Sequence, residues 1–594
     1  MFCISGPWVL NFPTIMLVGL FALVAGLVAP PPKSVVVGAG PAGLATAIAL
    51  AKRGWPDVQV YDRLPPPPGL ENNNAWSDTA RFYLIGIGGR GQRALRSIGA
   101  WDALEPYTAV VRGRKDWAPG AGVDGGVETI RADRPPSNVI QRDRLVASLL
   151  EQAKSLGITI KHEIDVSGIS WDGDEAILQC SPCGDECAAD EEGGKEFPGA
   201  FEVRAPFVVA SDGVRRTVCA ALEAEDAQRK WALPGRRFRV TKYEDTSVRV
   251  YKTVPFKPPK DWRKDINYSA RTSKFNFDAL PAPSGKAPAA DPSSGAAVDE
   301  YCGVLLIKPD DEATQGLQSV GDARAYVDEL LPQFAPFITD EALQAVVDKE
   351  PSRLPVFRYA GPRLYRGSST VLLGDAIHSV KPYFGLGVNS AFEDVAVLAD
   401  ELDKQADLGS ALKAYSDRRA AEARVLVQLS RSFDRSGFAG FLSFIGPIIM
   451  DGVFGGLPLL GKAFAPNTLA MLQKPTISFT AIRWRKRVDR AVQLAILATF
   501  ATCAAKLAAA AIKAAVRALA TTVVPYVMAS GARKLVAIPL ALAVAGYAGA
   551  RMSNPTIQSL MRGGKGGDVA DVLASQTTVK DDLGEKKIGT RPGY

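Results

Sequence analysis

One stretch near the N-terminus constrains the fold of this 594-residue chain more than any other. Residues 34–62 alternate between a β-branched run, a glycine-rich turn, a run of small helix-forming residues and a second β-branched run. The strand, helix and strand are predicted at Ser34–Gly38, Pro41–Arg53 and Val58–Tyr61. This order is a β-α-β unit, which implies a parallel sheet in an α/β fold.

The turn of this unit has the spacing of a dinucleotide-binding site. Its sequence is GAGPAG, and the acid that follows comes nineteen residues after the last glycine. The relevant residues are Gly38, Gly40, Gly43 and Asp62. The first glycine permits a tight turn, the second lets a pyrophosphate approach, the third lets helix pack on strand, and the acid accepts from ribose hydroxyls. A dinucleotide is therefore the expected ligand.

Composition excludes several classes of function. The chain has 70 basic and 63 acidic residues, a mild excess of +7, so nucleic-acid binding is not expected. With only His162 and His378 available, a histidine-rich metal site or a Ser-His-Asp triad is disfavoured, and no metal is expected. Seven cysteines lack framework spacing, and three of them lie in a predicted acidic hairpin tip rather than a zinc site: Cys180, Cys183 and Cys187.

Two later strand ends resemble further contacts to the same ligand. The buried-strand pattern Phe207–Ala210 leads into Asp212 and Gly213. The strand Thr370–Leu373 leads into Gly374 and Asp375, then into a glycine loop and a helix from Asn389 to Leu398, whose N-terminus offers N–H groups to an electron-rich partner.

Other elements complete the prediction. Arg81–Gly99 is interpreted as a strand followed by a helix, and Asn138–Ala153 contains a helix with Arg142 at its start, where a phosphate could pair with the guanidinium. Residues 236–355 carry alternating patterns typical of a separate sheet. Within them Ala279–Ala296, rich in Ala, Pro and Ser, is predicted to be a disordered loop.

These motifs, in this order, resemble the single-component FAD-dependent aromatic hydroxylases, and among them the kynurenine 3-monooxygenases. The resemblance also rests on Arg81, the Arg90-Gly91 pair, Arg142 with Leu145, the run LLGDAIHSVKPYFGLGVNSAFED, and ISFTAIRW before a basic and then apolar tail. It implies a Rossmann-like FAD-binding domain interleaved with a mixed β-sheet substrate domain. It also implies FAD and NADPH as cofactors, with O₂ and a small aromatic molecule as substrates.

The resemblance assigns roles to matching residues. Binding of FAD would involve Gly38, Gly40, Gly43, Asp62, Arg63, Arg142, Asp212, Gly213, Asp375, Gly385, Gly387, Val388 and Asn389. The reaction chamber would be formed by Arg81, Pro382, Phe384, Gly385 and Asn389, and Arg81 would pair with an amino-acid carboxylate, a job suited to a guanidinium fork. Arg81 could equally be a salt-bridged edge arginine. His378 is expected to have a packing role.

The chain departs from that family near Leu429-Ser430. No tyrosine stands where the family places one that contacts substrate; Ser432 and Phe433 are nearby instead. Two alternatives stay open: a membrane flavoprotein that epoxidises or reduces an isoprenoid, which the apolar N-terminal segment and C-terminal third favour, and a non-catalytic flavin-bound membrane scaffold.

Both ends of the chain are apolar. Phe12–Ala29 carries no charge and could be an anchor or a cleaved targeting segment. Phe438–Phe464 is apolar and broken by glycine and proline, and Arg483–Arg487 is a basic cluster with a tryptophan. The alanine-rich helix Ala491–Thr522 carries Lys506, Lys513 and Arg517 on one face, which favours an interfacial helix. Leu535–Ala550 is marginal as a span.

The predicted organisation follows from these patterns. Residues 1–32 form a targeting or anchor segment, 33–235 with 356–400 the FAD-binding domain, 236–355 the substrate sheet, 401–480 a helical cap, 481–552 membrane-associated helices and 553–594 a disordered tail. Membrane association is expected, at the outer mitochondrial membrane by the resemblance, with the endoplasmic reticulum or a plastid as alternatives.

Overall fold

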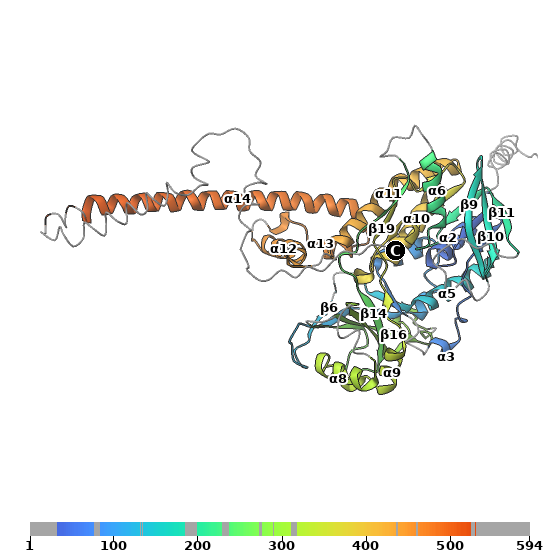
Figure 1. Cartoon of the computed structure of the whole chain (residues 1–594), viewed down its shortest axis with the longest axis horizontal. Coiled ribbons are helices and arrows are strands. Elements are labelled where there is room, and N and C mark those ends of the chain that lie inside the picture. The colour runs from blue at the N-terminus through green and yellow to red at the C-terminus, as the bar shows by residue number, and fades with distance from the viewer. Residues whose placement is uncertain are drawn as a thin grey trace, which may run out of the picture. The chain divides into compact units, whose positions relative to one another are not determined.

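The computed structural model, drawn in Figure 1, contains a six-stranded sheet in the order β20-β21-β12-β1-β2-β8. Its strands are β1 Ser34–Val37, β2 Val58–Tyr61, β8 Thr159–Lys161, β12 Phe207–Ala210, β20 Tyr365–Arg366 and β21 Thr370–Leu372. All neighbours are parallel except β20 and β21. Because β12 lies between β1 and β21, three strands from distant parts of the chain end side by side.

The structure describes residues 32–76, 83–130, 132, 135–183, 199–228, 237–272, 276–288, 290–309, 318–434, 437–458, 461–523, 525 and 529. The predictions for Phe12–Ala29, Arg81, Cys187, Leu535–Ala550 and the tail from Ser553 lie outside these residues. The chain divides into two compact units, Met1–Gln493 and Leu494–Tyr594.

Helices pack against the parallel sheet and form the larger hydrophobic core with it. They are α2 Pro41–Ala51, α4 Gly89–Ser97, α5 Arg142–Ser155, α6 Thr217–Gln228, α10 Leu386–Lys404 and α11 Leu408–Ser432, with the short α3 Asn73–Trp76. Helix α10 contacts α2, α4 and α11, so the helix that follows the glycine loop lies at the centre of the helical layer. The predicted β-α-β unit is confirmed, with α2 ending at Ala51.

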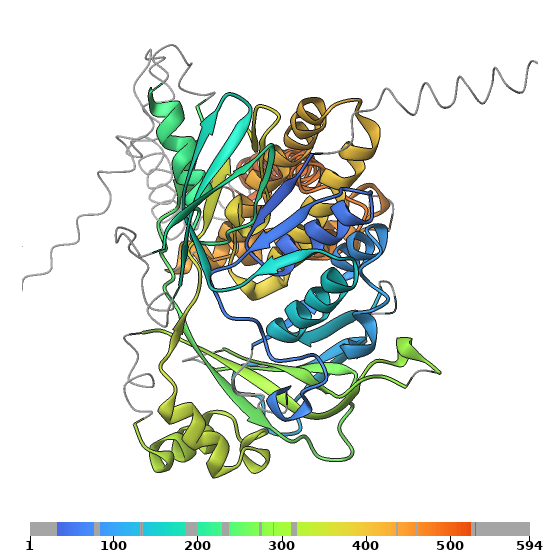
Figure 2. The ribbon, with the colours of Figure 1, turned by 90° about the vertical axis from the view of Figure 1, so that its right-hand side faces the viewer.

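A seven-stranded sheet forms the second layer, in the order β18-β14-β17-β16-β15-β5-β6. Its strands are β5 Gly113–Trp117, β6 Val127–Ile130, β14 Val250–Phe256, β15 Ile266–Arg271, β16 Asn276–Ser284, β17 Ala297–Ile307 and β18 Ser352–Arg353. Helices α8 Val320–Leu330 and α9 Asp340–Asp348 cover one face of it and share its core, as Figure 2 shows. Since β5 and β6 come from the N-terminal half, the two halves of the fold are interleaved.

Three small sheets join these layers. They are β3 Leu84–Ile87, β7 Ser137–Gln141 and β4 Ala109–Val111; β13 Arg239–Lys242, β19 Arg358–Gly361 and β22 His378–Ser379; and β9 Ile164–Asp172, β10 Glu175–Pro182 and β11 Phe201–Ala205. Short 3-10 turns are η1 Glu105–Tyr107, η4 Pro292–Ser294, η5 Ala335–Phe337, η6 Gly374–Ala376, η7 Pro382–Phe384 and η8 Gly461–Ala463.

One prediction of local structure is confirmed and another is wrong in part. Helix α5 begins at Arg142, as expected, and strand β7 occupies the residues just before it. The first part of the predicted disordered loop, residues 279–284, belongs to β16, a strand between β15 and β17. Low-complexity composition misled here because Ala279 and Ala282 are small apolar residues buried under neighbouring strands. The two prolines of that stretch are accommodated with a shift of register between Ala282 and Pro283.

The C-terminal helices are α12 Gly437–Gly455, α13 Thr468–Leu472, α14 Phe479–Ala518 and the π-helical turn η9 Leu519–Val523. Pro447 lies inside α12, which is nonetheless one helix. Within the described residues one helix, Phe479–Thr522, is long and apolar enough to cross a membrane, with a mean hydropathy of 1.8 over its best window. The helix predicted over Ala491–Thr522 is thus confirmed as helical.

The described residues include five of the cysteines and allow a search for metal-binding clusters. Cys180, Cys219, Cys302 and Cys503 are free, whereas Cys183 is disulfide-bonded. The described residues contain no cluster of three or more His, Cys, Asp or Glu side chains that could hold a metal ion.

Candidate functional site

The glycine turn after β1 is closed at two of its glycines and open at the third. A Cβ added at Gly38, where φ is +102°, would lie 2.5 Å from the Ser211 carbonyl oxygen, and one added at Gly43 would lie 1.9 Å from the Gly38 oxygen. At Gly40 no described atom lies within 4 Å of the added carbon. Gly40 is also the N-cap of α2, whose first turn carries no acidic residue. The turn therefore leaves space at a helix N-terminus for an anionic group.

Asp62 at the end of β2 is oriented by two backbone groups. Its carboxylate accepts from the Ala39 N–H at 2.6 Å and from the Leu64 N–H at 2.7 Å. The first of these bonds ties the acid directly to the glycine turn. Arg63, the next residue, is half-buried. The acid therefore lies where the ribose of a dinucleotide held by this turn would be recognised.

Arg142 is the first residue of α5, as the sequence predicts. Its guanidinium bonds Asp143 at 2.7 Å. Burial lowers the pKa of Arg142, but the nearby Tyr83, Asp143 and Asp62 outweigh that effect and raise it. The positive charge of Arg142 thus faces the same region as the Asp62 carboxylate.

Asp212, after β12, is a carboxyl group with one oxygen unused inside the described part of the chain. Its Oδ2 accepts from the Val218 N–H at 3.3 Å, whereas its buried Oδ1 has no hydrogen-bond partner there. Burial raises the pKa of this group to about 6. Gly213 follows with φ of +62°. A buried oxygen with unused capacity at a strand end is what a ligand hydroxyl would complete.

Arg216 connects the second strand end to the third, and sequence reasoning did not assign it this role. Its guanidinium is buried and donates to the Asp375 carbonyl at 2.5 Å, the Ala376 carbonyl at 3.1 Å and the Ser379 hydroxyl at 2.5 Å. The backbone of the turn after β21 is therefore held from the segment after β12. The sequence signal was a double arginine after Asp-Gly, which gave no indication of the target.

Asp375 lies in the turn after β21, where Gly374 has φ of +66°. The side chain reaches solvent, yet it is surrounded by enough protein that burial raises its pKa, against the pull of His378, Arg216 and Arg142. Tyr83 lies close enough to Asp375 and Arg142 to interact with both charges, and burial raises the pKa of its hydroxyl to about 12. Asp62, Arg142, Tyr83 and Asp375 thus form one electrostatically coupled group.

The loop of residues 382–389 begins α10. Gly385 takes the left-handed conformation, with φ of +61°, and is the N-cap of that helix. Gly387 and Val388 are half-buried in the first turn of the helix, and Pro382 is exposed. The residues at the N-terminus of α10 are therefore small or apolar, and they carry no charge.

Asn389 fixes this loop to the neighbouring β3-α4 turn. Its side-chain oxygen accepts from the Gly88 N–H at 2.9 Å, and its side-chain nitrogen donates to the Gly86 carbonyl at 2.9 Å and the Gly385 carbonyl at 2.5 Å. A Cβ at Gly91 would lie 2.2 Å from the Asn389 oxygen, so α4 approaches closely because of a glycine. All the polar atoms of the Asn389 side chain are engaged with backbone, which gives this residue a positioning role.

Aromatic rings extend from the loop to the C-terminal helices. The Phe384 ring lies 5.2 Å from that of Phe433, and Phe433 lies 5.8 Å from Phe444 of α12, both edge-on. Phe433, with Ser432, lies near Leu429-Ser430, the place where the sequence lacks the tyrosine of the family that it resembles. The surroundings of the loop are therefore aromatic and apolar on this side.

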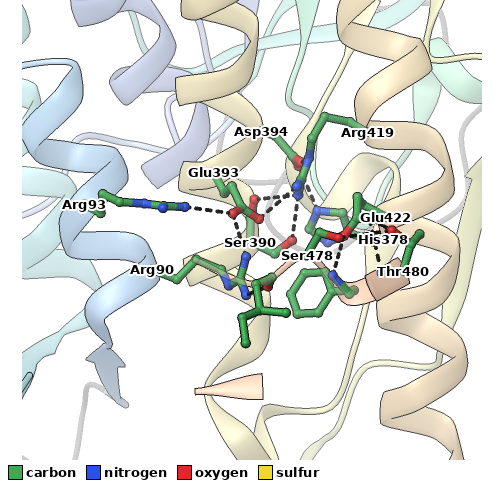
Figure 3. A network of polar contacts seen from close by, with 12 residues as sticks. Arg90, Arg93, His378, Ser390, Glu393, Asp394, Arg419, Glu422, Ser478 and Thr480 are labelled. Atoms are coloured by element: carbon green, nitrogen blue, oxygen red, sulfur yellow. Dashed lines mark hydrogen bonds and ion pairs between the residues drawn. The ribbon is translucent and has the colours of Figure 1, made fainter. Parts of the chain in front are cut away.

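His378 belongs to a buried ion network (Figure 3). Its Nε2 lies 2.7 Å from Asp394 Oδ2, and the same oxygen accepts from the Gly374 N–H at 2.9 Å. Both side chains are fully buried. This arrangement agrees with the packing role expected for His378.

The residues present fit a flavin dinucleotide. The ends of four neighbouring parallel strands, β21, β12, β1 and β2, supply an open glycine turn, the Asp62 carboxylate, an orphaned carboxyl oxygen and a helix N-terminus along one edge of one sheet. Such an edge is where open α/β sheets bind dinucleotides. The fold and site thus define a dinucleotide-binding protein with a second, seven-stranded sheet.

Comparison with known proteins identifies the group. The chain matches the family model described as the FAD binding domain over residues 33–252 and 339–430, and therefore belongs to that family, which includes FAD-dependent aromatic hydroxylases. It is 27% identical over 405 residues to a kynurenine 3-monooxygenase of Salinispora arenicola, covering 67% of this chain and 78% of that protein. It is also 27% identical over 433 residues to the Xanthomonas campestris protein of the same name, covering 70% and 82%.

Solved structures give weaker likenesses. A p-nitrophenol 4-monooxygenase from Pseudomonas putida has a TM-score of 0.48 at 17% identity, covering 77% of this chain and 96% of that one. A 2-methyl-3-hydroxypyridine-5-carboxylic acid oxygenase has a TM-score of 0.46 at 17% identity, covering 70% and 96%.

Proposed function

We propose that this protein is a membrane-associated monooxygenase that uses FAD, NADPH and O₂ to hydroxylate kynurenine to 3-hydroxykynurenine. The observation that carries the flavin part is the set of three adjacent strand ends with an open Gly40 between the closed Gly38 and Gly43. The substrate part rests on similarity to relatives named kynurenine 3-monooxygenase and on Arg81.

The adenosine half of FAD would lie on the first strand end. Gly40 and the α2 N-terminus would face the pyrophosphate, and Asp62 would accept from the ribose hydroxyls, with Arg63 and Arg142 alongside. Asp62 would have to exchange a backbone partner for the ribose or accept from both, which a carboxylate with four lone-pair sites can do.

The flavin half would extend over the second and third strand ends. Asp212, Gly213 and Asp375 would contact the ribitol and pyrophosphate side, and the loop of Gly385, Gly387, Val388 and Asn389 would flank the ring. When bound, FAD supplies the chemistry: it accepts a hydride from the nicotinamide and activates O₂ for transfer of one oxygen atom to an aromatic ring. Helix-terminal N–H groups of α10 would stabilise negative charge on the reduced cofactor.

The task of the protein is then orientation and exclusion of water. Phe384 and Phe433 provide an apolar wall beside the loop, and Pro382 fixes the direction in which the chain enters it. Arg81 would orient the substrate by pairing with its amino-acid carboxylate. Few protein acid-base groups are required, which suits a chain with only two histidines.

The helix Phe479–Thr522 is the proposed membrane element. Its described residues beyond Gln493 are almost all exposed, among them Leu497, Phe500 and Leu507. The outer mitochondrial membrane is the first compartment to examine, by resemblance. Flotation of the purified chain with phospholipid vesicles, and its loss on truncation after Gln493, tests the association.

A second candidate function is oxidation or reduction of an isoprenoid. The observation that favours it is the ring series Phe384, Phe433 and Phe444, which leads from the loop to the apolar helix α12. A lipid substrate has no need of a guanidinium at the ring, so Arg81 separates the two candidates.

The deciding experiment is NADPH oxidation by detergent-solubilised protein with kynurenine, phenolic acids and isoprenoids, scored as coupled hydroxylated or epoxidised product rather than peroxide. The proposal expects 3-hydroxykynurenine. Arg81→Ala is expected to raise the KM for kynurenine by one or more orders of magnitude, roughly 2 to 4 kcal/mol. An unchanged KM removes kynurenine. A yellow protein that oxidises NADPH with none of these compounds indicates a flavin-bound scaffold.

A further inference from the structure

The turn at Gly374 and Asp375 is hydrogen-bonded to a series of buried charged side chains, which begins with Asp394. Asp394 Oδ2 accepts from the Gly374 N–H, and Asp394 Oδ1 accepts from the Arg419 Nε at 2.6 Å. Burial raises the pKa of Asp394, but Arg419 and His378 outweigh it and hold that pKa below its ordinary value. The backbone of the turn is thus fixed by an ionised carboxylate that has no exposure to solvent.

The chain of charges continues to α4. Glu393 accepts from Arg419 Nη1 at 2.8 Å and from Arg90 Nη1 at 2.6 Å (Figure 3). The side chains of Arg90 and Arg419 are only 6% and 4% exposed, so neither is solvated if its acid is lost. Two arginines and two acids, taken from α4, α10 and α11, therefore balance one another in the interior.

The far end of this chain is the segment that leads into α14. Arg90 Nη2 donates to the carbonyls of Lys474 at 3.1 Å and Ile477 at 2.7 Å, and its guanidinium lies 4.4 Å from the centre of the Phe479 ring. The four contacts of the Arg90 guanidinium thus connect Glu393 of α10 to residues 474–479, which lie nearly four hundred positions after Arg90 in the sequence.

Glu422 of α11 holds the same segment from the other side. Its buried carboxylate accepts from the Phe479 N–H at 2.5 Å, from the Thr480 N–H at 3.2 Å and from the Thr480 hydroxyl. These groups form the N-terminus of α14, where a negative charge is favourable. The chain just before this segment also contacts the loop of residues 382–389, because the Gln473 side chain donates to the Phe384 carbonyl at 3.4 Å.

We propose that Arg90, Glu393, Arg419 and Asp394 are positioning residues for FAD, which hold the Gly374-Asp375 turn in its ligand-gripping conformation with the Lys474–Thr480 segment as their outer anchor. This inference rests on the proposed cofactor site. It makes the docked segment a component of the flavin site, in addition to being the approach to a membrane helix. Undocking the segment would leave Arg90 without two acceptors and Glu422 without its donors, and the strain would reach the turn through Glu393 and Asp394.

The test is a double-mutant cycle on the dissociation constant of FAD, measured by quenching of flavin fluorescence on addition to full-length apoprotein. Arg90→Met is combined with Asp375→Asn, at the turn that the network holds, and with Asp62→Asn, at the other end of the ligand. If the network acts through the turn, Arg90→Met weakens FAD binding by about 10-fold or more alone and with Asp62→Asn, but by less than about 3-fold with Asp375→Asn.

Arg96→Met is the matched control. Arg96 lies on the same helix, 52% of its side chain is exposed, and it pairs with Glu105 at 3.8 Å outside the network. Its replacement should leave FAD affinity unchanged. Arg90→Lys keeps the charge but cannot reach one acid and two carbonyls together, so partial rescue is expected. The visible circular dichroism of bound flavin should change with Arg90→Met and not with Arg96→Met.

The outcomes separate the two proposals. Equal effects of Arg90→Met in both aspartate backgrounds, or none in either, overturn the positioning role. Failure of Asp375→Asn to weaken FAD binding overturns the proposed cofactor site at this turn, and the positioning role with it. Where Arg90→Met does not fold, Glu422→Gln, which keeps the size of the side chain, takes its place in the cycle with the same expectations.

Discussion

The side-chain oxygen of Asn389 accepts a hydrogen bond from the backbone N–H of Gly88 at 2.9 Å. Through this bond, and two more to the carbonyls of Gly86 and Gly385, the first turn of α10 is attached to the turn between β3 and α4. One amide therefore sets the position of the loop against the turn after β3, the strand that follows Tyr83 in the sequence.

Replacing Asn389 by Ala should destabilise the apoprotein markedly. Three hydrogen bonds at about 1 kcal/mol each, with buried backbone groups left unpaired, give a loss of roughly 2 to 4 kcal/mol. Urea unfolding measures it. Asn72→Ala is the control, because Asn72 is exposed and makes one capping bond, to the Ala75 N–H at 3.2 Å; an equal loss in both variants contradicts the role given to Asn389.

Alanine substitutions at Gly40 and Gly43 should have opposite effects. Gly40 has φ of −70°, which alanine adopts, and the space beside it is open, so Gly40→Ala should fold with unchanged thermal stability yet bind FAD at least about 10-fold more weakly. Gly43→Ala places a carbon 1.9 Å from a backbone oxygen and should destabilise the fold itself by about 1 to 3 kcal/mol or more.

Differential scanning calorimetry of the apoproteins and flavin fluorescence titration distinguish these effects. Gly54→Ala is no suitable control because its φ is +78°. Gly69, with open space and no positive φ, is the suitable one, and Gly69→Ala should change neither quantity. Normal FAD affinity of Gly40→Ala would show that the open side of the turn does not face the ligand.

Asp212 should make the apoprotein less stable as pH rises. Burial raises its folded pKa to about 6, above the unfolded value near 3.9, so the folded state keeps a proton that the unfolded state has already lost. Between about pH 4 and pH 6 this linkage lowers the free energy of unfolding by roughly 3 kcal/mol. Asp212→Asn removes the ionisation and should remove this component, so that the variant is more stable than the parent at pH 7 and equal to it near pH 4.

Denaturant unfolding across that pH range gives the comparison. The difference between parent and variant is the quantity to plot, because other carboxylates titrate in both. A difference that stays constant from pH 4 to pH 7 contradicts the raised pKa of Asp212.

The sequence predicted those features of the fold that depend on a few adjacent residues. The β-branched run at β1, the glycines of the turn and the strand ends before Asp212 and Asp375 are each set by a few adjacent residues, and the structure has them at the expected places. The order β21-β12-β1 then places these strand ends side by side. A dinucleotide site was therefore predictable.

The contacts that hold the site were not predictable, because their partners are far apart in sequence. Arg216 and the Asp375 carbonyl are 159 positions apart, and Arg90 and Ile477 are 387 apart. A buried charged side chain requires a partner of opposite charge or a hydrogen-bond acceptor, but the sequence does not identify that partner. For the same reason β16 was missed: its burial comes from neighbours and not from its own composition.

Lys381 offers the sharpest test of such a long-range contact. Its side chain is fully buried just before the loop, and its Nζ lies 2.8 Å from Asp245, 2.6 Å from Asp434 and 2.7 Å from the Ser247 carbonyl. The Lys381 ammonium thus connects the segment before β14, which contains Asp245 and Ser247, with Asp434 just after α11. Burial raises the pKa of Asp434 even against the attraction of Lys381.

Lys381→Met should therefore cost about 3 to 5 kcal/mol at pH 7, because two buried carboxylates lose their counter-charge. The loss should shrink as pH falls, since burial already raises the pKa of Asp434 and this acid can then take up a proton in the folded state. Lys381→Met combined with Asp434→Asn removes one of the stranded charges and should recover part of the stability. Lys413→Met is the control: its exposed pair with Asp417 on α11 should give no measurable change. Equal losses in the single and double variants at pH 7 and at lower pH would mean that packing, rather than charge, explains the role of Lys381.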